Sequence, residues 1–247
     1  MMEYFELKET LILTLFSLVA LQISSSPLFP SLSFFFLFLG VNGVKNTLNY
    51  ELNRIYHRRK FKGDFHEAYK LAFLFLLIAL IMAYYFGYGH YFLLSAVAYF
   101  LSSLIKARAS FFSDFLYFLA SIFTFSIPFQ LSPSPFEIPF LWSLSLILFL
   151  RRIIWDIIRP FGVENFNLPK MLGLKGARNV FYLLSLLTLL WLTMPAAVGH
   201  TAYSALYAIP FSFIITSSYL VRTDRAKEAE KVLDYALLSY LFTSIFL

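Results

Sequence analysis

Cysteine is absent from the 247-residue sequence. Disulfide bonds, thiolate nucleophiles and thiolate metal sites are therefore excluded. Charged residues are scarce as well, because they make up 14% of the chain, against about 25% in soluble domains. Hydrophobic residues make up 60% of it. This composition predicts an all-α polytopic membrane protein in which residues 1–247 form a single transmembrane helical domain.

Lys and Arg are missing from every second stretch between the apolar runs. Those stretches are Ser24–Ser31, Gly87–His90, Gln130–Glu137 and Met194–Ala202, whereas all 20 Lys and Arg residues lie in the alternate stretches. Lys and Arg near the ends of membrane spans stay on the cytoplasmic side. We therefore expect an integral protein of the cell membrane with its N-terminus in the cytoplasm and its C-terminus outside.

A membrane-crossing helix needs about 20 apolar residues, and the apolar runs predict nine spans. They are Thr10–Leu28, Ser31–Val44, Tyr69–Phe86, Tyr91–Ile105, Ser110–Phe129, Ile138–Ile158, Asn179–Ala197, Tyr203–Val221 and Lys231–Leu247. Two cytoplasmic segments, 45–68 and 159–178, are too long and too polar to be simple turns. We expect these two segments to cap the bundle.

The net charge of +6 would suggest nucleic acid as the partner of a soluble protein. In a membrane protein the positive charge faces anionic lipid headgroups, so we expect membrane lipid and no nucleic acid. A Walker loop, the His boxes of a membrane desaturase and a Ser-His-Asp constellation are all missing from the sequence. A small transporter stays open on composition, although two long cytoplasmic segments rather than a broken midplane helix argue against it.

Two polar faces mark the cytoplasmic ends of the second and sixth predicted spans. Asn46, Asn49 and Asn53 recur at intervals of three and four residues, so they share one helical face, and Arg54 follows them. Arg152, Asp156 and Arg159 share a second face in the same way. Polar residues at membrane depth are costly unless they are used, so the two faces predict a binding site. An ion pair between Arg152 and Asp156 that merely makes the span end tolerable is the alternative.

One carboxylate lies about a turn inside the fifth predicted span. An isolated charge at the depth of Asp114 is costly. We expect this side chain to pair with Lys106 or Arg108, or to be neutral.

The segments around these faces resemble the UbiA-type membrane prenyltransferases over nearly the whole chain. The family carries N-D-x-x-D-Y-E-I-D-x-I-N after its second span, where this chain has N-T-L-N-Y-E-L-N-R-I-Y at Asn46–Tyr56. It carries D-x-x-D-x-x-G-D after its sixth span, where this chain has D-I-I-R-P-F-G-V at Asp156–Val163. The family tail T-L-P-x-x-L-G-L-K-x-A-R resembles N-L-P-K-M-L-G-L-K-G-A-R at Asn167–Arg178, and its L-K after the fourth span resembles Ile105-Lys106. The resemblance implies nine helices around a central cavity that opens to the cytoplasm.

The resemblance also implies a site for an isoprenoid diphosphate, and the departures from it bear on function. Family aspartates hold Mg²⁺ on the diphosphate, and Mg²⁺ takes oxygen ligands. Here Thr47, Asn49 and Asn53 replace the three aspartates of the first motif. In the second motif, Asp156 is kept, and Arg159 and Val163 replace the other two. Glu51 and Glu164 are the nearby carboxylates with which Asp156 would have to share a metal ion, so we treat Mg²⁺ as a doubtful cofactor.

Three interpretations of the function stay open at this stage. The one we favour is a membrane protein that binds an isoprenoid diphosphate or related lipid, with Mg²⁺-dependent transfer lost or modified. The second is an active prenyltransferase in which Asp156 and Lys106 are catalytic, and the cations Arg54, Lys106, Arg152 and Arg159 stabilise the diphosphate as Arg and Lys can. The third is a non-catalytic scaffold or partner subunit of another membrane protein. In the first two, Asn46, Asn49, Asn53 and Asp114 also line the ligand site.

Overall fold

The computed structural model describes residues 6–25, 30–48, 65–106, 109–131, 134, 136–160, 166–197 and 204–246. Within these ranges the chain forms nine helices and no strand. The helices are α1 (Leu7–Ile23), α2 (Ser31–Leu48), α4 (Phe65–Tyr85), α5 (Gly89–Ile105), α6 (Ser110–Leu131), α7 (Glu137–Ile158), α8 (Leu168–Ala197), α9 (Ser204–Arg222) and α10 (Ala226–Ser244). The all-α prediction is therefore confirmed.

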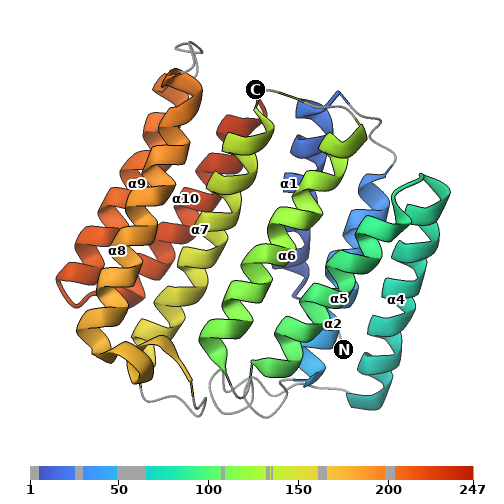
Figure 1. The fold of residues 1–247 in the computed structure, drawn as a ribbon, viewed down its shortest axis with the longest axis horizontal. Coiled ribbons are helices and arrows are strands. Elements are labelled where there is room, and N and C mark those ends of the chain that lie inside the picture. The colour runs from blue at the N-terminus through green and yellow to red at the C-terminus, as the bar shows by residue number, and fades with distance from the viewer. Residues whose placement is uncertain are drawn as a thin grey trace.

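Successive helices alternate in direction and pack side by side, as Figure 1 shows. Each described helix contacts the next one along the chain, and α10 contacts α1, so the bundle closes into a ring. Inner contacts of α1 with α6 and of α7 with α10 fill the middle of this ring.

Hydrophobic side chains cover the outside of the bundle as well as its inside. Leu77 and Ile81 on α4, and Leu183 and Leu190 on α8, are each more than half exposed. Such surfaces face lipid in a membrane protein, where every backbone polar group is satisfied within the helices.

Four of the described helices are long and apolar enough to cross a membrane. They are His66–Tyr85, Ser110–Gln130, Glu137–Ile158 and Leu168–Ala197. Shorter apolar helices cover Glu9–Ile23, Gly89–Ile105 and Leu206–Arg222. This pattern agrees with an integral membrane protein.

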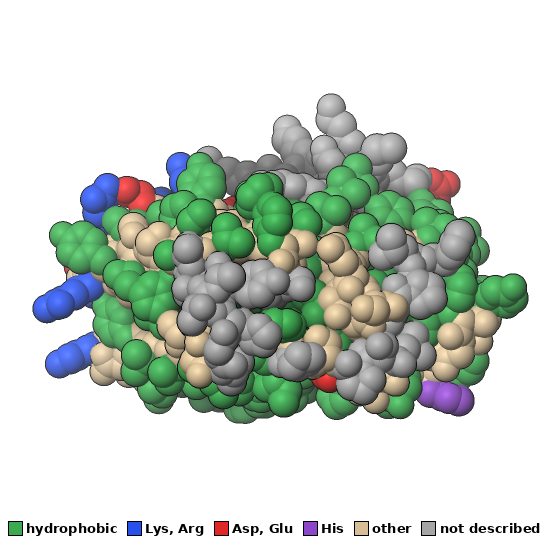
Figure 2. Space-filling model, turned by 90° about the horizontal axis from the view of Figure 1, so that it is seen from above, with side chains coloured by type: hydrophobic (Ala, Val, Ile, Leu, Met, Phe, Trp, Pro, Cys, Tyr) green, Lys and Arg blue, Asp and Glu red, His purple; other side chains and the backbone are tan. Residues whose placement is uncertain are grey.

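The described Lys and Arg residues gather at one end of the bundle, where α2, α5, α7 and α9 end and α4, α8 and α10 begin. Those with described side chains are Lys45, Lys70, Lys106, Arg151, Arg152, Arg159, Lys170, Lys175, Arg178, Arg222, Arg225, Lys227 and Lys231. Seen from the opposite end, the residues drawn in colour are largely hydrophobic or uncharged, with Lys and Arg at the margin of the face (Figure 2). We call the Lys- and Arg-rich end the charged end.

Most element boundaries differ from the sequence prediction by one to five residues, and two differences have a local cause in the backbone. The first predicted span reaches Leu28, but α1 ends at Ile23, because the Ser24 hydroxyl donates to the Leu21 carbonyl and Ser25 turns the backbone to a φ of 53°. The seventh predicted span begins at Asn179, but α8 already begins at Leu168 and is kinked at Gly173, which has φ 73° and ψ 163°. Part of the predicted 159–178 cap is therefore helical.

Candidate functional site

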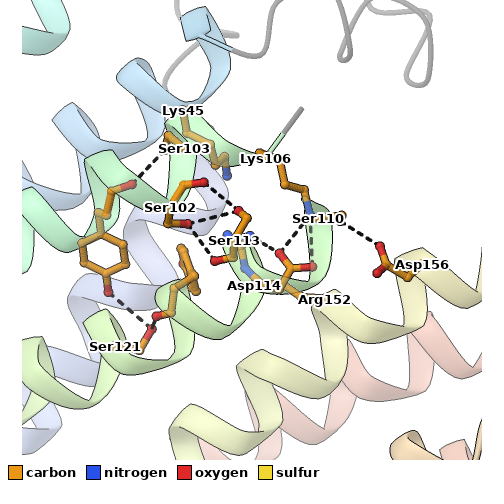
Figure 3. Close-up of polar contacts among 12 residues, drawn as sticks. Lys45, Ser102, Ser103, Lys106, Ser110, Ser113, Asp114, Ser121, Arg152 and Asp156 are labelled. Carbon is orange, nitrogen blue, oxygen red and sulfur yellow. Dashed lines mark hydrogen bonds and ion pairs between the residues drawn. The ribbon is translucent and has the colours of Figure 1, made fainter. Parts of the chain in front are cut away.

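Five polar side chains from three helices meet at the charged end. Lys106 closes α5, Ser110 and Asp114 lie in the first two turns of α6, and Arg152 and Asp156 lie near the end of α7. They are linked by the hydrogen bonds and ion pairs drawn in Figure 3. We call these five residues the charged network.

Asp114 is the centre of the charged network. Its side chain is 1% exposed and accepts hydrogen bonds from Lys106 Nζ at 2.9 and 3.0 Å, one on each carboxylate oxygen. Arg152 donates to Oδ1 of the same carboxylate at 2.9 Å. The predicted partner Lys106 is therefore confirmed, whereas Arg108 lies outside the described residues. Arg152 is a second partner that periodicity within one helix could not indicate.

Asp156 has a different environment from Asp114. The Ser110 hydroxyl donates to its Oδ1 at 2.9 Å, and the Leu168 backbone N–H donates to its Oδ2 at 3.1 Å. Ser110 in turn accepts from Lys106 Nζ at 2.8 Å. Asp156 therefore joins the end of α7 to the start of α8, and the alternative of an Arg152–Asp156 ion pair is wrong, since Arg152 binds Asp114.

Arginine side chains at the end of α7 also lie over aromatic rings. The guanidinium carbon of Arg152 is 3.4 Å from the ring centroid of Tyr117, and that of Arg159 is 4.4 Å from the ring centroid of Trp155. Such cation–π contacts are worth roughly 0.5–2 kcal/mol, and the larger values apply where water is excluded. They fix the planes of two cations that the sequence assigns to a ligand.

A pair of serines holds the two helices that carry Lys106 and Asp114. Ser102 donates to the Ser113 carbonyl at 3.0 Å, and Ser113 donates to the Ser102 carbonyl at 2.7 Å. Both serines are buried. This reciprocal contact between α5 and α6 keeps Lys106 within reach of Asp114.

A second charged cluster, which the sequence analysis did not assign to the site, joins α1 to α2. Lys45 Nζ lies 2.7 Å from Glu6 Oε2 and 3.7 Å from Glu9 Oε2, and it donates to Asn42 Oδ1 at 3.3 Å. Asn42 also donates to Thr10 Oγ1 at 3.0 Å. Burial raises the pKa of the Glu6 carboxyl, and Lys45 acts in the opposite direction. Lys45 directly precedes Asn46, so these carboxylates lie at the start of the first motif.

The structure describes only the beginning of that first motif. Asn46 and Thr47 are buried on α2, and the Thr47 hydroxyl contacts the Gly43 and Val44 carbonyls of its own helix at 2.9 and 3.0 Å. The other predicted site residues of the two cap segments lie outside the described residues: Asn49, Glu51, Asn53, Arg54 and Glu164. The central cavity that those segments would cap stays a prediction.

The described residues do not fit a magnesium site. No group of three His, Cys, Asp or Glu side chains within them could hold a metal ion. Both oxygens of Asp156 accept hydrogen bonds, and Asp114 is bound by two cations. Each oxygen of Asp156 keeps a second lone pair, so Asp156 would hold a metal only together with further ligands, for which the sequence offers Glu51 and Glu164 outside the described residues.

The fold is similar to that of solved membrane proteins. One structure, described as giving structural and mechanistic insights into the biosynthesis of digeranylgeranylglyceryl phosphate synthase in membranes, superposes with a TM-score of 0.76 at 17% identity over 99% of this chain and 97% of that chain. The apo structure of a UbiA homologue from Aeropyrum pernix K1 superposes with a TM-score of 0.75 at 15% identity over 98% of both chains.

No protein-family model matches the chain, and no curated protein matches it by sequence. The structural likeness and the sequence motifs nevertheless agree over nearly the full length. The chain has the fold of the UbiA-type membrane prenyltransferases.

Proposed function

We propose that this protein binds the diphosphate of an isoprenoid, or a related phosphorylated lipid, at the charged end without requiring Mg²⁺. In this proposal Mg²⁺-dependent prenyl transfer is lost or modified. The observation that carries it is the charged network, in which Lys106 and Arg152 converge on one point while the retained motif carboxylate, Asp156, is held by Ser110 and the Leu168 amide.

The balance of charge supports binding that does not depend on a metal ion. The two cations Lys106 and Arg152, both bound to Asp114, equal in number the two carboxylates Asp114 and Asp156, so the network lacks the excess negative charge that would require a metal ion. Arg152 uses one of its nitrogens on Asp114, and a guanidinium carries five N–H donors. Its remaining donors, with Arg159 two helical turns further along the chain, are suited to phosphate oxygens.

Thermal unfolding of the purified protein with geranylgeranyl diphosphate, in the presence of Mg²⁺ or of a chelator, tests this function. A ligand at about 100 times its dissociation constant stabilises the folded state by about 2.7 kcal/mol, which is a shift of roughly 5–11 °C at this chain length. We expect the same shift in both conditions. We expect Arg152→Gln and Arg159→Gln to reduce it, and Arg178→Gln, which removes an exposed pair with Asp224 at the same end, to leave it unchanged.

Other outcomes select the other functions. A shift in melting temperature that requires Mg²⁺ would contradict the metal-free site. It would indicate a metal bound by Asp156 with Glu51 or Glu164. The next experiment would then be an assay of diphosphate release with lipid acceptors. Unchanged affinity in Arg159→Gln would remove Arg159 from the site. The absence of any shift would leave the scaffold or partner-subunit function.

We further propose that the charged end faces the cytoplasm, so that α1 begins on the cytoplasmic side of the membrane. The basis is the retention of Lys and Arg on the cytoplasmic side. Because the chain has no cysteine, single cysteines report topology without background labelling. Lys227→Cys at the charged end should react with a membrane-impermeant thiol reagent only after the cells are opened, whereas Tyr85→Cys, 85% exposed at the other end, should react in intact cells. The reverse pattern would invert the topology.

A further inference from the structure

The first residues of α8 expose hydrophobic side chains beside lysines at the charged end of the bundle. Four large hydrophobic side chains there are each more than a third exposed: Phe166, Met171, Leu172 and Leu174. Lys170 and Lys175 are exposed among them. We call residues 166–175 the α8 N-terminal segment. This mixture of exposed apolar and basic side chains is typical of segments that lie in the plane of a membrane surface.

The inner side of this segment is bonded to α6 and α7, which fixes the direction of its outer side. The Leu168 N–H donates to Asp156 Oδ2 at 3.1 Å, and the Phe111 N–H donates to the Phe166 carbonyl at 3.3 Å. Asn167 and Leu168 are each 1% exposed. The segment therefore cannot turn its exposed hydrophobic side chains inward without breaking these bonds.

A glycine separates the first turn of α8 from the rest of the helix, which starts at the charged end in Figure 1. Gly173 has φ 73° and ψ 163°, a conformation that favours glycine because it has no Cβ. A Cβ at this position would meet no atom within 4 Å, so the kink faces open space. The first turn therefore lies at an angle to the part of α8 that crosses the membrane, and its exposed side chains are able to lie along the membrane surface.

The turn between α9 and α10, at the same end, has a different character. Residues 222–228 include no exposed large hydrophobic side chain. Its charges are paired, since Arg225 binds Glu228 and Asp224 binds Arg178 of α8. The α8 N-terminal segment has two Lys residues and no Asp or Glu. Its charge is therefore complementary to anionic lipid headgroups, and its exposed apolar side chains are complementary to acyl chains.

We propose that the α8 N-terminal segment is a binding surface for anionic phospholipid. Its hydrophobic side chains enter the acyl region of the leaflet at the charged end, and Lys170 and Lys175 extend their ammonium groups to the lipid phosphates. Because the inner side of the segment donates the Leu168 N–H to Asp156, lipid bound to the outer side supports this hydrogen bond of the charged network. The surface binds lipid whether or not the charged network binds a diphosphate.

The two lysines set the size of the preference for anionic lipid. Each Lys next to an anionic membrane surface strengthens the attraction about fivefold. Two of them strengthen it by up to about 25-fold, and salt screens part of this attraction. We therefore expect the segment to prefer phosphatidylglycerol over phosphatidylcholine by at least about fivefold.

Fluorescence quenching in nanodiscs measures this preference. Because the chain has no cysteine, Met171→Cys carries a single bimane label on the segment. The full-length protein is placed in phosphatidylcholine nanodiscs that contain a small fraction of quencher lipid. The quencher is phosphatidylcholine or phosphatidylglycerol with a spin label on its acyl chain. Lys227→Cys carries the same label on exposed α10 at the same end and is the control for position.

Two double variants, each combined with Met171→Cys, separate the charge of the segment from the charge of the whole end. Lys170→Gln with Lys175→Gln removes both lysines of the segment. Lys227→Gln with Lys231→Gln is the matched control, because it removes two lysines of α10 at the same end. All four side chains are exposed, so we expect both double variants to fold.

We expect both quencher lipids to quench the label on Met171→Cys, phosphatidylglycerol at least about fivefold more effectively, and to quench the label on Lys227→Cys much less. The segment double variant should lose the preference and stay quenched, and the α10 double variant should keep the preference.

Three results would overturn the proposal. Equal quenching by the two lipids would remove the preference for anionic lipid. Equal loss of the preference in both double variants would assign it to the charged end as a whole. Absence of quenching of the label on Met171→Cys would place the segment in water, where its exposed hydrophobic side chains would instead fit a protein partner.

Discussion

Neutralising Asp114 should destabilise the protein and strengthen its binding of anions at the same time. Asp114→Asn keeps the size of the side chain but removes the charge that faces Lys106 and Arg152. Breaking a buried ion pair by removing one partner costs about 3–5 kcal/mol. The two cations are 25% and 17% exposed, so water compensates them in part and we expect the lower end, about 3 kcal/mol. At this chain length that lowers the melting temperature by about 6–12 °C.

The same substitution leaves two cations without their carboxylate at the proposed diphosphate site. Two unit charges about 6 Å apart at an effective dielectric constant of about 20 interact by about 3 kcal/mol. If salt and partial exposure halve this energy, inorganic diphosphate should bind Asp114→Asn about tenfold more tightly than the wild type. Thermal unfolding and diphosphate titration of the same preparation measure both effects.

Asp224→Asn is the matched control, because Asp224 pairs with Arg178 at the same end of the bundle but is 73% exposed. Exposed pairs contribute about 0–1 kcal/mol, so this variant should melt close to the wild type. The reasoning fails if Asp114→Asn melts within 2 °C of Asp224→Asn. Weaker diphosphate binding by Asp114→Asn would refute the assignment of Lys106 and Arg152 to the anion site.

Three further substitutions test the packing around the site by thermal unfolding. Gly40→Ala places a Cβ 2.7 Å from Leu76 Cγ and 2.9 Å from the Ala72 carbonyl oxygen, so it should cost about 1–3 kcal/mol; wild-type stability would show that α2 and α4 separate readily. Gly173→Ala forces a side chain into the positive φ at the α8 kink and should lower the free energy of unfolding by about 1–3 kcal/mol. Unchanged stability would indicate that α8 is straight at this position. Tyr117→Leu should be about 1 kcal/mol less stable than Tyr117→Phe, because only the aromatic ring keeps the Arg152 contact; equal stability would remove that contact's contribution.

The sequence predicts the helix boundaries of this fold well where a change in hydropathy sets them. It predicts them poorly where local hydrogen bonds set them. The range Ile138–Ile158 differs from α7 by one residue at its start and ends at the same residue, just before Arg159 and Pro160. The end of α1 is different, because serine side chains compete for backbone groups and close the helix at Ile23 before the apolar run ends.

Periodicity predicts which residues share a face of a helix, but not which other helix that face meets. Arg152 and Asp156 share a face as expected, yet Arg152 binds Asp114 of α6, and Asp156 is bound from α6 and α8. Ser110 was missed because a single serine at the start of a helix has no distinctive spacing. Glu6 and Glu9 were missed because their partner, Lys45, lies on another helix.

The contact between α1 and α10 has a consequence for the order in which the bundle assembles. The Gln22 side-chain amide donates to the Ile245 carbonyl, which lies 223 residues further along the chain, at 3.2 Å. Phe16 of α1 likewise stacks on Tyr240 of α10. During synthesis, α1 can therefore make its contacts with α10, and so close the ring, only after almost the whole of this sequence has been made. Contacts so distant in sequence form late and slowly, and a chain interrupted before Ala226 would leave a seam open to lipid between α1 and α7.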